Sequence, residues 1–228
     1  MSKVLKNSFF LILFLLSFNL HGQIVKKSPL SKKEQQAFAR TLIQDLNKGV
    51  LLVRLNFHQN QINYFRSIIE DQSQPEKDRK WARTSLNDIE SRRDTFNIFL
   101  RAALDSVYRF SEVRYIYDKD YNSNDPAENE GNFLNKKFVK DPSISIGNKK
   151  FLLLIYTNLT LTSGQSKENF RIVSPDFTDV PEAIQIPGSG ILFNIKSDIR
   201  NIPQFKKAMI NKVRSYQEKL DEYYSNGL

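Results

Sequence analysis

The hydrophobic pattern of the chain opens with a helix signal. Ser31 and Glu34 have the spacing of a capping box, in which the serine oxygen accepts a backbone N–H and the glutamate reaches back to the serine. Apolar residues then recur at every fourth position between Phe38 and Leu46, which predicts an amphipathic helix. Gly49 follows, and we expect it to end this helix in a left-handed conformation.

Strand patterns follow at several points along the chain. The run from Val50 to Phe57 is almost continuously apolar and has no helical period, which is typical of a strand buried on both faces. Four further segments rich in β-branched, aromatic or other apolar residues are predicted as strands, namely Glu112 to Tyr117, Phe151 to Leu161, Phe170 to Val173 and Ile191 to Ile195.

Helical patterns lie between and after these strands. A short one follows the first strand, and a longer one opens at Pro75 and keeps helical spacing as far as Val107, with a bend or a second helix allowed near residues 91–94. Trp81 lies near the start of the longer pattern and is expected to dock against a neighbouring helix. A last helix opens at Pro203.

The order of these elements predicts the fold class. Helical crossovers between apolar strands favour an α/β fold with a mainly parallel sheet in the N-terminal part, an antiparallel extension toward the C-terminus, and flanking helices. The stretch from residue 118 to residue 132 is polar and is expected to be a long loop.

The first 22 residues have the layout of a secretory signal peptide. Lys3 and Lys6 precede an apolar run from Phe9 to Phe18, and Gly22 is suited to the position before a cleavage site. The run is about half the length that a membrane-spanning helix needs. We therefore expect residues 1–22 to be removed, leaving residues 23–228 as a single exported α/β domain without a transmembrane segment.

Charge and cysteine content narrow the function further. The chain contains no cysteine, which excludes disulfides, thiolate metal ligands and a cysteine nucleophile. Its net charge is +9, and removing Lys3 and Lys6 lowers this by two, to +7. Such a surplus favours an acidic envelope component or protein as partner, while export argues against nucleic acid.

Several segments together resemble a known kind of protein. The apolar GVLLVRL after an amphipathic helix, the strand VRYIYDKD and a basic C-terminal helix ending in EKLDEYY are similar to a family of small exported bacterial proteins without an established activity. The resemblance implies export and assigns no functional residue.

The polar loop carries a possible cation site. Asp118, Asp120, Asn122 and Asn124 alternate as oxygen ligands do in the first half of a calcium loop, although Ser123 stands where that loop has its glycine. Calcium or another divalent metal is therefore one hypothesis, and a solvated polar loop is the other. No other cofactor is evident, because glycine-rich phosphate-binding motifs are absent from the sequence.

A catalytic site is conceivable at one edge of the sheet. His58 is the only histidine after residue 22, and it follows the first strand, while Asp118 and Asp120 follow the second. If the two strands are parallel, these three residues share an edge where ligands commonly bind. The sequence thus supports two hypotheses, an exported non-enzymatic binding or envelope-associated protein and, as the alternative, a carboxylate-based or metal-assisted hydrolase.

Overall fold

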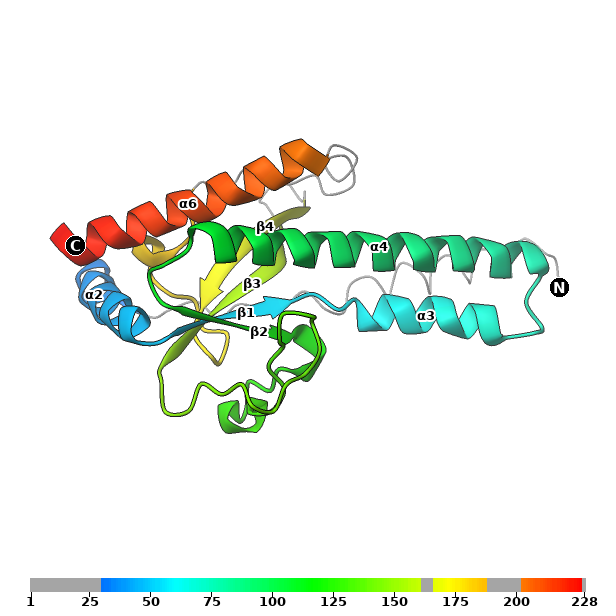
Figure 1. Ribbon diagram of the computed structural model, residues 1–228, viewed down its shortest axis with the longest axis horizontal. Coiled ribbons are helices and arrows are strands. Elements are labelled where there is room, and N and C mark those ends of the chain that lie inside the picture. Colours follow the sequence, from blue (N-terminus) through cyan, green and yellow to red (C-terminus); the bar gives the residue numbers. More distant parts are fainter. Residues whose placement is uncertain (1–29, 161–165, 188–201, 227–228) are drawn as a thin grey trace.

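The computed structural model describes residues 30–160, 166–187 and 202–226. The described elements include four α-helices and four β-strands, joined in part by short 3-10 turns (Figure 1). In chain order they are α2 (Lys32–Lys48), β1 (Val50–Leu55), α3 (Gln59–Glu70), α4 (Glu76–Val107), β2 (Glu112–Tyr117), β3 (Phe151–Thr160), β4 (Ser166–Val173) and α6 (Ile202–Asn226). The signal peptide of residues 1–22 and the strand expected at Ile191 to Ile195 lie outside the described residues.

The described strands form one mixed sheet of the α/β class, in the order β2-β1-β3-β4. β1 is parallel to both β2 and β3, whereas β3 and β4 are antiparallel. The predicted mainly parallel sheet with an antiparallel extension is confirmed. Helical crossovers make the parallel pairing possible, because a tight turn cannot join parallel strands.

Helix α2 begins as the capping box requires but ends for a different reason than expected. The Ser31 N–H donates to Glu34 Oε2 at 2.9 Å, and the Glu34 N–H donates back to Ser31 Oγ at 3.5 Å. Gly49 has φ −110°, so the expected left-handed conformation is wrong. A Cβ atom on Gly49 would lie 2.2 Å from the carbonyl oxygen of Lys150 and 2.7 Å from that of Asp45. Close approach of three backbone segments, and not a positive φ, requires glycine here.

Alternate residues of β1 point into two separate apolar clusters. Leu51, Val53 and Leu55 pack with α2, α4 and α6 on one face of the sheet, while Val50 and Leu52 pack on the other. The strand is therefore buried on both faces, as its continuous apolar run predicts.

The two faces have different covers. The helices α2, α4 and α6 lie on one face, and the long connection between β2 and β3 crosses the other (Figure 1). This connection contributes Phe133 and Ile146, which are 0% and 6% exposed, to the second cluster. The expectation of flanking helices thus holds for one face only, because buried side chains of an irregular segment cover the other.

Helix α4 is one uninterrupted helix of 32 residues, about 48 Å long at 1.5 Å per residue. The bend allowed near residues 91–94 is absent. The N-terminal half of α4 packs along α3, and the two form a helical arm, residues 59–93, which projects beyond the sheet (Figure 1). Among the described residues, no helix has both the length and the apolar character needed to cross a membrane.

Candidate functional site

The structure brings His58 and Asp118 to the same edge of the sheet. β1 and β2 run parallel with Leu55 opposite Tyr117, so the residues that follow each strand leave the sheet side by side. The backbone N–H of Phe57 donates to Asp118 Oδ1 at 3.1 Å, which joins the two strand ends directly. We call this region the strand-end edge, defined by His58, Asp118 and Asp120.

His58 has an unusual backbone conformation at this edge. It is the N-cap of α3 with φ 56° and ψ 32°, in the left-handed region that histidine occupies more readily than most residues. Its backbone N–H donates to Asn56 Oδ1 at 3.1 Å. Its side chain makes no capping hydrogen bond to the helix.

The surroundings of His58 favour a neutral imidazole. Burial is the largest cause that lowers the pKa of His58, and the nearby guanidinium groups of Arg93 and Arg92 lower it further. Asp118 and a hydrogen bond with Gln61 act in the opposite direction but do not outweigh burial. A neutral imidazole beside a carboxylate is chemically able to accept a proton.

The two aspartates of the edge have separate partners. Asp118 accepts a hydrogen bond from the Phe57 N–H. Burial lowers the pKa of the half-buried Arg54, and the negative charge of Asp118 acts in the opposite direction by stabilising the guanidinium. Asp120 forms ion pairs with Lys140 at 3.0 Å and with Lys119 at 3.6 Å. The carboxylates are thus engaged by different groups of the protein and do not share a proton or a hydrogen bond in the described contacts.

The remaining members of the calcium-like pattern have roles within the loop itself. Asn122 Oδ1 accepts the N–H groups of Asn124 at 2.9 Å and of Asp125 at 3.3 Å, as in an Asx turn. The buried amide of Asn129 accepts from the Asn122 N–H and donates to the Asn122 carbonyl. Within the described ranges, no group of three or more histidine, aspartate or glutamate side chains is placed to hold a metal ion.

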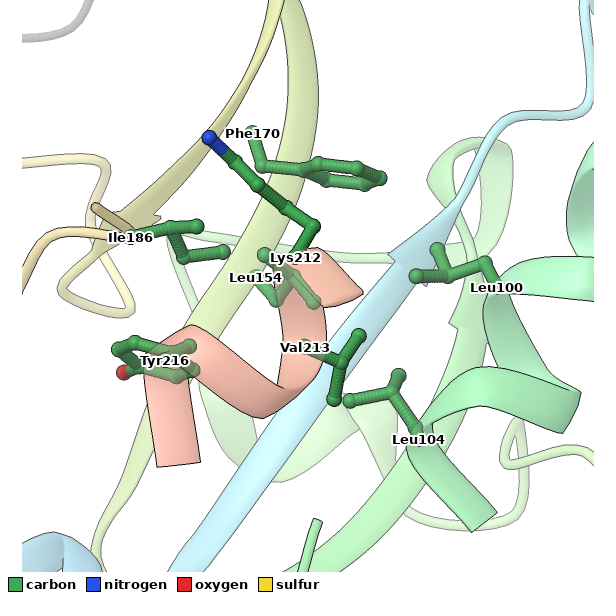
Figure 2. Close-up of a pocket in the computed structure, with 8 residues that line it drawn as sticks. All are labelled: Leu100, Leu104, Leu154, Phe170, Ile186, Lys212, Val213 and Tyr216. Atoms are coloured by element: carbon green, nitrogen blue, oxygen red, sulfur yellow. The ribbon is translucent and has the colours of Figure 1, made fainter. Parts of the chain in front are cut away.

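Two of the cavities in the described part of the chain lie away from this edge. One, of about 10 Å³, is hardly larger than a water molecule and lies between the sheet and the helices (Figure 2). In it Lys212 and Tyr216 project from α6 among apolar side chains of α4, β3 and β4 (Figure 2). The other is an open depression of about 410 Å³ beside Glu130 and Phe151. Neither is lined by a residue of the strand-end edge.

A basic turn next to this edge was not found by sequence reasoning. We call residues 135–140 the lysine turn, in which Lys136 and Lys137 are exposed and Val139 is 57% exposed. Asn135 Oδ1 accepts the N–H groups of Lys137 at 2.9 Å and of Val139 at 3.3 Å, which closes the turn. The signal was visible as three lysines in KKFVK, but its exposure depends on how the loop folds.

Helix α4 and strand β2 hold the lysine turn in place. Arg101 donates from its guanidinium to the Asn135 carbonyl at 2.6 Å and stacks over the ring of Phe138 at 5.3 Å. The Tyr117 hydroxyl donates to the Phe138 carbonyl at 3.4 Å. Phe138 itself has φ 58°, a left-handed conformation that an unsupported phenylalanine rarely adopts. The turn therefore presents its lysines from a fixed position.

Comparison with protein-family models, with curated proteins and with solved structures finds no match to this chain.

Proposed function

We propose that this chain is an exported, non-enzymatic binding or envelope-associated protein, and that its lysine turn contacts an acidic envelope component. The single observation that carries the proposal is the lysine turn itself, where two exposed lysines and one exposed valine extend from a braced loop. Such a surface attracts an acidic partner through charge and gains from burying one apolar side chain.

The distribution of ion pairs supports this contact. Asp120 contacts the turn through Lys140, its side chain is only 13% exposed, and Lys119 and Lys140 both pair with it. Lys136 and Lys137 form no ion pair with any described residue. Asp141 follows the turn directly, and its Oδ1 accepts hydrogen bonds from the N–H and hydroxyl of Ser143. The turn therefore presents two lysines whose charge no ion pair with a described residue neutralises.

Salt dependence tests the proposal. The mature protein is mixed with an isolated envelope fraction at about 50 mM and about 500 mM salt, and the bound fraction is measured after sedimentation. The Debye length falls from about 14 Å to about 4 Å over this range, so an electrostatic contact is expected to weaken strongly. Binding that is unchanged by salt, or no binding at the lower concentration, would contradict the proposal.

One observation favours the alternative, a carboxylate-based or metal-assisted hydrolase. His58 and Asp118 lie at one edge, and the imidazole has a lowered pKa that keeps it ready to accept a proton. Titration with calcium and with magnesium tests the metal-assisted form of this alternative. A saturable rise in melting temperature that Asp118→Asn abolishes would favour the metal-assisted hydrolase, whereas no rise would exclude that form.

A further inference from the structure

The arm buries only one stripe of each of its two helices. Ile62 and Phe65 of α3 and Ala82 of α4 are buried, while Ile69 and Leu86 remain half-buried. Among the described residues, no third element covers the outer faces of this two-helix hairpin, whereas a bundle of four helices closes an apolar centre. In the part of the chain that the structure describes, the arm is thus a two-helix hairpin that projects from the domain (Figure 1).

Aromatic side chains of both helices gather on the arm. The ring of Phe65 lies 5.3 Å from that of Tyr64 and 5.3 Å from that of Trp81, in edge-to-face geometry. Tyr64 is 37% exposed and Trp81 is 48% exposed. We call these three residues the aromatic strip. Tryptophan and tyrosine exposed in this way are the residues that most often anchor protein interfaces.

The charges of the arm argue against an acidic partner at this strip. Residues 59–93 contain seven lysines or arginines and six aspartates or glutamates, so their net charge is +1. Glu76 pairs with Arg79 at 2.6 Å and with Arg83 at 3.0 Å, and Arg66 pairs with Glu90 at 3.3 Å. The arm therefore lacks the surplus charge that the rest of the mature chain carries, and a neutral surface can meet an identical one without strong repulsion.

We propose that the aromatic strip binds the same strip of a second copy of this chain, so that two arms form a four-helix bundle. A two-fold contact requires one self-complementary patch, which an aromatic strip with balanced charges supplies. This inference is independent of the proposed function, because the arm and the lysine turn are different surfaces.

Salt distinguishes the two contacts. The rest of each mature chain is strongly basic, so two copies repel each other at low salt, and screening relieves this repulsion. Dimerisation through the aromatic strip is expected to strengthen between about 50 mM and about 500 mM salt. Binding of an acidic partner at the lysine turn is expected to weaken over the same range of salt.

The test is sedimentation equilibrium of the mature protein over a range of concentrations, together with fluorescence. Trp81 is the only tryptophan of the chain, so its emission reports on the strip and is expected to shift to shorter wavelength as the dimer forms. Tyr64→Glu keeps this reporter and is expected to weaken the dimer about 30-fold, the effect of losing one interface anchor. Tyr64→Gln should weaken it less.

Ile98→Glu is the matched control. Ile98 is 50% exposed and lies on α4 outside the arm, so the same charge is added without touching the strip. Circular dichroism verifies that each variant folds. A wild-type protein that remains monomeric at every concentration would overturn the inference. So would a dimer that dissociates at high salt, or one that Ile98→Glu weakens as much as Tyr64→Glu.

Discussion

The amide of Gln185 takes the place of a neighbouring strand beside β4. The N–H of Ile172 donates to Gln185 Oε1 at 2.9 Å, and Gln185 Nε2 donates to the Ile172 carbonyl at 2.8 Å. The same Nε2 lies 3.1 Å from Asp179 Oδ1 and 3.3 Å from the Val180 carbonyl. Gln185 is 6% exposed, so water has little access to these groups.

Replacing Gln185 with methionine keeps the volume and removes every one of these hydrogen bonds. The Ile172 N–H and C=O groups would then be buried without partners, at about 1–3 kcal/mol each, so we expect Gln185→Met to lower the free energy of unfolding by about 2–5 kcal/mol. Urea denaturation of the protein measures this change. The control is Gln36→Met on the exposed side of α2, expected to change stability by less than about 0.5 kcal/mol. Equal stability of the two variants would refute the role assigned to Gln185.

Three further results are expected. Gly49→Ala should destabilise the protein by about 3 kcal/mol in urea denaturation, because the new Cβ atom meets backbone that cannot move aside; a loss below about 1 kcal/mol would contradict this. Folding lowers the pKa of His58 below its unfolded value of 6.5, so the unfolded chain binds more protons and stability falls as pH drops through 6.5. Between pH 7.5 and 5, the melting temperature should therefore fall further for the wild type than for His58→Asn, and equal falls would disprove this linkage. Mass analysis of the protein exported by its native host should find a first residue at or near Gln23, whereas intact Met1 would exclude a cleaved signal peptide.

Local signals made part of the fold predictable. The capping box of Ser31 and Glu34 needs only four consecutive residues, and both of its hydrogen bonds are present. The apolar run beginning at Val50 identified a strand buried on both faces. In such a strand both sets of alternate residues face apolar surroundings, so polar and apolar residues do not alternate along it. Parallel pairing then placed His58 and Asp118 at one edge, since the ends of parallel strands meet.

Contacts between distant residues were not predictable in this way. The need for glycine at position 49 comes from the carbonyl of Lys150, about a hundred residues away in the sequence. The course of the polar loop depends on buried amides such as that of Asn129, which leave no periodic signal. The residues that interact with the strand-end edge were not predicted either, because they are distant in the sequence. Arg93, which lies near His58, comes from α4, and Lys140, which pairs with Asp120, comes from the lysine turn.

Charge reversal at two places tests the central claim, that the lysine turn contacts an acidic partner. Lys136→Glu with Lys137→Glu changes the turn, and Lys206→Glu with Lys207→Glu makes the same change of net charge on exposed positions of α6, outside both proposed contacts. An exposed lysine near an anionic surface contributes about 1 kcal/mol, so removing two from the turn should weaken binding to the envelope fraction about 30-fold or more. The α6 variant should bind within about threefold of the wild type. Equal loss in both variants, or full binding by the turn variant, would contradict the account.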